Sequence, residues 1–299
     1  MRFYTARMND TLQTRDGVSL HVRAWPLVAA AAASAGPARG SVLIVHGLGE
    51  HIGRHAHVAA HLNGWGWHVV GFDQRGHGRS GGARGRLAAA DDLLLDLSQV
   101  IDAMRAEHAG PLVLLGHSMG GLVAARFVAE GSAALPAAWH RNVDALVLSS
   151  PALDPGMSAA QRLLLSVLGR LAPNLAVGNG LSPEWISRDP AVVAAYVADP
   201  WVHDRITPRL ARFILDGGAF VRGQAAQWKV PTLLMYAGSD RCVAPAGSRA
   251  FAAALPPGRL SVHEFGPLFH EIFNEPEQAD VFAVLGAWLA AREHRKNTG

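Results

Sequence analysis

The sequence is nearly free of cysteine and has no long apolar run. Cys242 is the single cysteine among 299 residues, so no disulfide can form within one chain. No apolar run reaches the ~18 residues that a membrane span needs, and the opening MRFYTARMNDTLQTRDG has no apolar segment of signal-peptide length. Together these absences favour a reducing compartment. We therefore expect a cytoplasmic protein.

Charge is also scarce and evenly spread. There are 27 Lys and Arg against 24 Asp and Glu, a net charge of +3, and the basic residues do not cluster. This balance disfavours a nucleic-acid partner. No cysteine and histidine cluster suggests a metal site, so we expect neither a metal nor an organic cofactor. Apolar residues make up 49% of the chain and charged residues 17%, which is enough for a large core and argues against disorder.

Short apolar runs alternate with helical patterns along the chain. Residues 12–25 alternate around Asp16-Gly17, which is typical of a hairpin. The later apolar runs have the pattern of buried strands and lie at 41–45, 68–72, 112–115, 145–149, 232–236 and 260–265. Helical periodicity is found at 91–108, 121–131 and 277–294. This alternation predicts an α/β fold with a mostly parallel sheet covered by helices on both faces.

One region breaks the alternation. Residues 155–227 contain helical pieces and several prolines but no strand candidate. They lie between the predicted strands at 145–149 and 232–236, which is where a helical cap can be inserted into such a fold. We therefore expect one core made of residues 1–154 and 228–299, with residues 155–227 as its cap.

The segment LVLLGHSMGGL, residues 112–122, places a serine between a strand and a helix. This is the context of a nucleophile elbow, a sharp turn that exposes the hydroxyl of a serine, here Ser118. Gly116 and Gly120 stand where side chains would collide across so tight a turn. The helix that follows favours developing negative charge at its amino end. Ser118 is the candidate nucleophile.

A serine nucleophile needs a base, and the base needs an orienting acid. In this fold the acid follows the serine in the chain and the histidine comes last. Asp240 lies just beyond the strand at 232–236, where catalytic groups gather. The acids that compete with it are less well placed: Asp154, Asp199, Asp204 and Glu264.

Two histidines compete for the role of base. His263 belongs to the run at 260–265, where a histidine is usually a packed or half-exposed residue. His270 follows that run in GPLFHEIFNEP, a loop from which a side chain can reach the serine. We therefore expect His270 to be the base. His77 precedes the serine in a glycine-rich turn and is left out.

Two backbone amides complete the predicted site. HGLGEH, residues 46–51, follows the strand at 41–45, so its N–H groups can face the serine across the crevice. The amides of Leu48 and Met119 are the expected oxyanion hole, because main-chain donors need no particular side chain.

Several segments together resemble the monoacylglycerol lipase and lysophospholipase family of α/β-hydrolases. They are HGLGEHIGRH, GFDQRGHGRSGG, GHSMGG, AGSDRCVAP and FHEIFNEP, and the similarity extends from about Leu12 to Leu289. The resemblance implies Ser118, Asp240 and His270 as the catalytic triad, and the Leu48 and Met119 amides as the oxyanion hole. The chain departs from the family's pattern at Phe269, where tyrosine is common, and at His55, where an aromatic hydroxyl is frequent.

Other positions that match the family have no expected chemical role. Asp73, Arg75 and Ser80 are interpreted as loop scaffolding. Glu50, His51 and Arg54 are likewise interpreted as structural supports.

The substrate is predicted from a leucine-rich segment. Residues 161–172 contain five leucines and one valine, with Arg162 and Arg170 as the only charges. Such a helix buries one side and leaves apolar surface to line a pocket or to contact a lipid surface. We expect Leu164, Leu168 and Cys242 to line the pocket, with transient contact between the cap and a membrane or lipid droplet. The alternative for the helix is that both of its sides pack within the cap. The alternative for Cys242 is that it is a small buried residue that fills space in the core.

The leading hypothesis is a serine esterase that hydrolyses monoacylglycerols or similar single-chain esters through an acyl-enzyme. A general small-ester esterase, a lysophospholipase, a thioesterase, a perhydrolase and a carbon–carbon bond hydrolase use the same triad. Epoxide hydrolases and haloalkane dehalogenases attack with an aspartate at the elbow, so Ser118 argues against both. A further alternative is a silent binding protein on a hydrolase scaffold, although such proteins usually lack a triad member.

Overall fold

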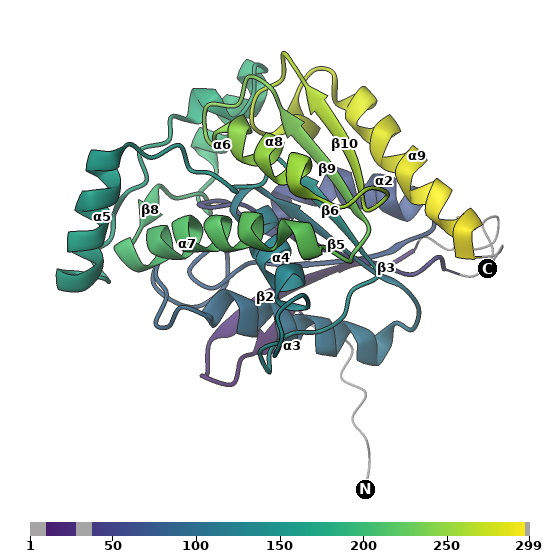
Figure 1. The fold of residues 1–299 in the computed structure, drawn as a ribbon, viewed down its shortest axis with the longest axis horizontal. Helices are drawn as coiled ribbons and strands as arrows, with labels where there is room; N and C mark the ends of the chain where they lie inside the picture. Colours follow the sequence, from purple (N-terminus) through teal and green to yellow (C-terminus); the bar gives the residue numbers. More distant parts are fainter. Residues whose placement is uncertain (1–9, 28–37, 297–299) are drawn as a thin grey trace, which may run out of the picture.

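A computed structural model describes residues 10–27 and 38–296. An eight-stranded sheet forms its centre, in the order β1-β2-β4-β3-β5-β6-β9-β10 (Figure 1). These strands are β1 (Thr11–Gln13), β2 (Ser19–Trp25), β3 (Ser41–Val45), β4 (His68–Phe72), β5 (Leu112–His117), β6 (Ala145–Ser149), β9 (Thr232–Ala237) and β10 (Leu260–Phe265). The boundaries of four predicted strands, β3, β4, β6 and β10, are identical to those in the structure.

The sheet is parallel from β4 to β10. The β1–β2 hairpin turns at Asp16-Gly17, and β2 pairs with β4 in the antiparallel sense. All further pairings, from β4–β3 to β9–β10, are parallel. The carboxyl ends of these strands therefore meet at one edge, where active sites of α/β folds are built. The predicted α/β-hydrolase architecture is confirmed.

Each face of the sheet has its own core. Leu43 and Val45 pack with helices on one face, while Val42 and Ile44 alternate to the other. The first face is covered by α3 (Asp92–Glu107), α4 (Ser118–Glu130), α7 (Pro208–Gln224) and α8 (Pro245–Ala254). The second is covered by α2 (Ala56–Gly64) and α9 (Gln278–Lys296) (Figure 1). The short 3₁₀ helices are η1 (Ile52–His55), η2 (Pro183–Trp185), η3 (Ala225–Gln227) and η4 (Ile272–Asn274).

The last strand differs from its prediction. Residues 260–265 were expected to be buried, but four consecutive residues of β10 are exposed, His263 among them. The reason is position, because β10 pairs only with β9 and forms the edge of the sheet. The apolar run predicted the strand correctly but not its place in the sheet.

The segment between β6 and β9 consists mainly of helices. It contains α5 (Ala159–Leu171) and α6 (Pro190–Ala198) together with α7. The expectation that it holds no strand was wrong, since β7 (Val177–Gly178) and β8 (Arg205–Ile206) form a small antiparallel pair. Two-residue strands carry too little alternation to be recognised in a sequence. Figure 1 shows α5 standing out at the edge of the molecule.

No helix in the described part of the chain is both long and apolar enough to cross a membrane.

Candidate active site

Ser118 lies at the point where β5 becomes α4. Its backbone has a φ of 54°, a left-handed conformation that is strained for any residue with a side chain. A Cβ atom on Gly116 would lie 2.5 Å from the Gly120 carbonyl oxygen, and one on Gly120 would lie 2.1 Å from the Val45 carbonyl oxygen. Only glycine fits at these two positions, so the backbone can turn sharply enough to present the hydroxyl.

His270 lies between Ser118 and Asp240. Its Nε2 atom is 2.8 Å from Ser118 Oγ, and its Nδ1 atom is 2.7 Å from Asp240 Oδ2. The second carboxylate oxygen, Asp240 Oδ1, accepts the N–H groups of Cys242 and Val243 at 2.8 and 3.1 Å. The carboxylate is therefore fixed by its own loop and can hold the Nδ1–H tautomer, which leaves Nε2 free to accept the serine proton. The structure brings together the three side chains selected from the sequence.

Burial and charge act in opposite directions on His270. Burial alone would lower the pKa of this imidazole, but Asp240 raises it, and Glu271 and Glu50 add to that effect. The net direction is upward. A raised pKa stabilises the imidazolium that forms when the base takes a proton.

Leu48 and Met119, the residues predicted to supply the oxyanion hole, lie beside the serine. Leu48 contributes to the walls of both cavities next to Ser118, and Met119 contributes to one of them. The Leu48 N–H donates no hydrogen bond to another backbone group in the described ranges. Met119 belongs to the first turn of α4, where N–H groups have no partner within the helix.

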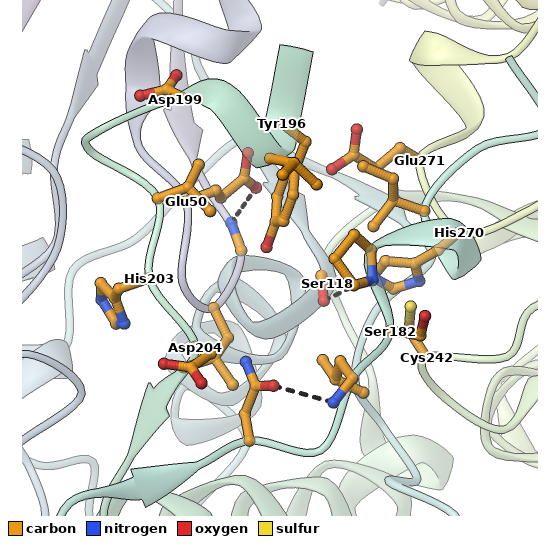
Figure 2. Close-up of a pocket in the computed structure, with 18 of the residues that line it drawn as sticks. Glu50, Ser118, Ser182, Tyr196, Asp199, His203, Asp204, Cys242, His270 and Glu271 are labelled. Atoms are coloured by element: carbon orange, nitrogen blue, oxygen red, sulfur yellow. Dashed lines mark hydrogen bonds between the residues drawn. The ribbon is translucent and has the colours of Figure 1, made fainter. Parts of the chain in front are cut away.

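Two cavities open on either side of Ser118. One, of 340 Å³, has several titratable side chains in its walls, among them Glu50, His117, Tyr196, Asp199, His203 and Glu271 (Figure 2). We call it the polar cavity after these side chains. The other, of 520 Å³, has mostly apolar walls, which include Met119, Met157, Trp185, Ile206, Ile214 and Val243. Leu48, Ser118, Asn179, Leu181 and Cys242 contribute to both. Ser118 thus borders both the polar cavity and the apolar one.

The three predicted pocket residues lie in different places. Cys242 lines both cavities, and burial together with the nearby Asp240 raises the pKa of its thiol, which stays neutral. Leu164 is 57% exposed on α5, and neither it nor Leu168 is part of either cavity wall. α5 contacts α7; its Leu165 is buried and Leu168 half-buried, whereas Leu163, Leu164 and Leu171 are exposed. The sequence predicted an excess of leucine but not the direction in which it faces.

The sequence analysis missed several cavity residues from the segment between β6 and β9. Tyr196, Val197 and Asp199 come from α6 and the residue after it, and His203 precedes β8. Figure 2 shows Tyr196 pointing into the cavity near Ser118. Nothing in the local sequence marks these residues, because their partners lie far away along the chain: Asp199 bonds to His51, 148 positions earlier, at 2.8 Å.

Among the described residues, one group has donor atoms close enough to hold a metal. Atoms of Asp240, Cys242 and His270 lie within 4.8 Å of one another. The Asp240–His270 hydrogen bond already occupies two of these donors. The thiol is held neutral, whereas metals bind the thiolate. This donor set fits an acid–base pair better than a metal site.

Comparison with known proteins identifies the family. Residues 36–277 match the sequence profile of the family described as serine aminopeptidase, S33. The chain belongs to this family. A monoacylglycerol lipase of Mycolicibacterium smegmatis is 36% identical over 257 residues, which cover 85% of this chain and 89% of that protein. A phospholipase of Bacillus subtilis is 32% identical over 253 residues, which cover 83% of this chain and 93% of that protein.

The fold agrees with a solved structure. The crystal structure of Paleococcus ferrophilus monoacylglycerol lipase matches with a TM-score of 0.78 at 33% identity, covering 91% of this chain and 98% of that chain. The resemblance seen in the sequence motifs is therefore confirmed. This family member is an α/β-hydrolase, and the lipase names of its relatives place it among the carboxylic-ester hydrolases.

Proposed function

We propose that the protein hydrolyses single-chain lipid esters with Ser118 as nucleophile, His270 as base and Asp240 as orienting acid. The observation that carries this proposal is the position of His270, within 2.8 Å of Ser118 Oγ and 2.7 Å of Asp240 Oδ2. These contacts have the geometry that acyl transfer requires, with the nucleophile bonded to the base and the base to its orienting acid.

Acylation begins when His270 Nε2 takes the proton of Ser118 as Oγ attacks the ester carbonyl. The carbonyl π electrons move to oxygen, and the resulting oxyanion accepts the N–H groups of Leu48 and Met119. When the carbonyl re-forms, the bond to the alcohol oxygen breaks. His270 returns the proton to that oxygen, so the alcohol leaves neutral and an acyl-serine remains.

Deacylation repeats the sequence with water. His270 removes a proton from the water as its oxygen attacks the acyl-serine carbonyl, and the same amides hold the second oxyanion. Collapse breaks the bond to Ser118 Oγ, and the proton passes back to that oxygen. The net reaction consumes one ester and one water, and releases one carboxylic acid and one alcohol.

The two cavities suggest which end of the substrate lies where. The apolar 520 Å³ cavity suits an acyl chain, and the polar 340 Å³ cavity suits the alcohol. The polar cavity is walled by four carboxylates (Glu50, Asp199, Asp204 and Glu271) and, within the described residues, by no lysine or arginine. Arg54 already pairs with Glu50 and Glu271 and is not part of the wall, so no described wall residue offers a phosphate a lysine or arginine. A neutral alcohol such as glycerol is therefore favoured over the phosphate-bearing head of a lysophospholipid.

A panel of soluble monoesters tests this assignment. Each buried methylene contributes about 0.8 kcal/mol, so octanoylglycerol should exceed acetylglycerol in kcat/KM by at least about 100-fold. A triacylglycerol and an octanoyl ester of glycerol phosphate should both be poor substrates, the first for lack of room and the second for its charge. A preference for the acetyl ester would indicate a general small-ester esterase. Equal rates on octanoylglycerol and its phosphate would indicate a lysophospholipase.

We further propose that residues 155–227 act as a cap over this site and that α5 contacts the lipid surface that supplies the substrate. Leu163 and Leu171 of α5 are 68% and 80% exposed, with Leu164 and Val167 exposed between them. The helix carries Arg162 and Arg170 but no acidic residue. An apolar stripe with basic flanks is typical of helices that lie on anionic lipid surfaces.

Vesicle flotation tests the role of α5. Replacing Leu163 and Leu171 together with serine should weaken binding to vesicles that contain anionic lipid by about tenfold or more, because apolar area leaves the interface. Leu135→Ser is the matched control, since Leu135 is 89% exposed but lies in the loop between α4 and β6. Equal loss in the control, or binding that persists in the double variant, would contradict contact through α5.

A further inference from the structure

Two buried carboxylates beside the site share one arginine. Arg54, at η1, donates from Nη1 to Glu50 Oε2 at 3.0 Å and to Glu271 Oε1 at 2.5 Å. Its Nη2 donates to Glu271 Oε2 at 2.7 Å, so the contact with Glu271 is bidentate. The three side chains are 4% to 11% exposed, and the Tyr196 ring lies 4.7 Å from the guanidinium carbon. We call these three residues, Glu50, Arg54 and Glu271, the carboxylate bridge.

Each end of the carboxylate bridge reaches a different part of the catalytic machinery. At one end, Glu50 Oε1 accepts the Gly47 N–H at 2.6 Å, and His55 Nε2 lies 3.2 Å from both oxygens of Glu50. The Leu48 N–H shares a peptide plane with the Gly47 carbonyl, and that carbonyl lies 2.8 Å from His46 Nδ1. Glu50 and His46 thus hold the two sides of Gly47, and together they fix the direction of the Leu48 N–H. At the other end, Glu271 follows His270 in the chain, and its own N–H donates to the Ile186 carbonyl at 2.8 Å.

We propose that the carboxylate bridge is a positioning device that locks the Leu48 amide and His270 into one arrangement and sets the charge around the base. This inference rests on the proposed function, since it assigns Leu48 and His270 their roles in acyl transfer. Glu50 acts through Gly47 and Glu271 through the neighbouring base. None of the three residues of the bridge exchanges a proton with the substrate.

The charge around His270 comes from a small set of groups. Three of the groups near His270 are neutral. Burial, and to a smaller extent the nearby His270, lowers the pKa of His117 to about 3. Burial raises the pKa of the Cys242 thiol and of the Tyr196 hydroxyl. The remaining charged groups are Asp240, Glu50 and Glu271, and Arg54 is the cationic partner of the two glutamates. Of these carboxylates, only Asp240 contacts the imidazole by a hydrogen bond in the structure. Within the carboxylate bridge, Glu50 and Glu271 supply the rest of the negative charge, and Arg54 balances part of it.

Two substitutions of Glu50 separate its position from its charge. Glu50→Gln removes the charge but keeps an oxygen that can accept the Gly47 N–H, whereas Glu50→Ala removes both. We expect Glu50→Ala to lower kcat on octanoylglycerol by about 100-fold with little change in KM, as loss of an oxyanion donor does, and Glu50→Gln to retain about ten times more kcat.

Both substitutions should shift the pH profile in the same direction. His270 acts as a base only when neutral, so kcat/KM rises with pH through its pKa. Removing a nearby negative charge lowers that pKa, and the acid limb should move to lower pH by about 0.5 to 1 unit in either variant. Glu271→Gln, measured alongside, should shift the limb in the same direction.

Glu130 provides a matched control away from the site. Its Oε1 accepts the Ala137 N–H at 2.9 Å, and its Oε2 accepts from Arg126 Nη1 at 2.5 Å, which repeats the bonding of Glu50. Glu130→Gln and Glu130→Ala should leave the acid limb in place. Equal kcat losses in the two Glu50 variants, or an acid limb that does not move in either, would overturn the proposal.

A fluorophosphonate probe distinguishes failure of this inference from failure of the proposed function. Wild-type protein that reacts with the probe at Ser118, combined with Glu50 variants that behave like the Glu130 controls, would contradict the carboxylate bridge alone. Wild-type protein that hydrolyses esters without reacting at Ser118 would contradict the proposed function, and the bridge with it.

Discussion

Replacing Ser118 by alanine is expected to lower kcat on octanoylglycerol by about 10⁴- to 10⁶-fold, because no acyl-enzyme can form. His270→Ala should cost a similar factor, since the hydroxyl is a weak nucleophile until Nε2 takes its proton. The double variant should be little worse than either single variant, because the two residues act as a unit. Steady-state rates per mole of folded protein measure all three.

His263→Ala is the control for this series. His263 is exposed on β10, at the edge of the sheet. Its removal should leave kcat unchanged. A large loss of kcat in His263→Ala, together with nearly normal kcat in His270→Ala, would contradict the assignment of the base.

Asp240→Asn is expected to lower kcat by about 10⁴-fold near neutral pH. Asp240 Oδ2 holds His270 Nδ1 at 2.7 Å, and an amide nitrogen at that position would instead donate to Nδ1. The imidazole would then carry its proton on Nε2, facing Ser118, and could not act as a base. Loss of the carboxylate should also lower the pKa of His270, because Asp240 is the strongest contributor that raises it.

The control for this substitution is Asp204→Asn. Asp204 lines the polar cavity but pairs with Arg205 near the surface, with its side chain 66% exposed. It should leave the tautomer of His270 untouched and lower kcat by less than about tenfold, as expected for a screened surface charge. Comparable losses in the two variants would contradict the role assigned to Asp240.

The sheet could be predicted from the sequence because its strands are short, buried apolar runs followed by turns. The runs at 41–45 and 68–72 match β3 and β4 in every residue. Burial of a strand depends on its neighbours, however, and β10 is paired on one side only. The pair β7–β8 is held by partners 29 residues apart, Val177 and Ile206, and no local pattern predicts such a contact.

The triad candidates could be selected because each follows a strand in the order that the fold imposes. Ser118, Asp240 and His270 lie within hydrogen-bond distance of one another through His270. The walls of the polar cavity could not be predicted in this way. Tyr196 and Asp199 reach the site from α6 and its end because the segment between β6 and β9 folds back over the sheet edge, which depends on tertiary contacts.

The roles of Glu50 and Arg54 depend on similarly distant contacts. Both were interpreted as structural supports, which agrees with their burial. Arg54 also pairs with Glu271, which lies 217 positions beyond it in the chain. Only the folded structure shows that Glu50, from the loop of Leu48, and Glu271, the residue after His270, bind the same Arg54 guanidinium.

The central claim is that Ser118 becomes acylated during turnover. Its most direct test is mass spectrometry of the protein after reaction with a fluorophosphonate probe, followed by identification of the modified peptide. The account predicts one adduct per chain on Ser118, with loss of esterase activity in proportion to labelling and no adduct in Ser118→Ala. Hydrolysis that continues in fully labelled protein, or an adduct on another residue that accounts for the lost activity, would contradict it.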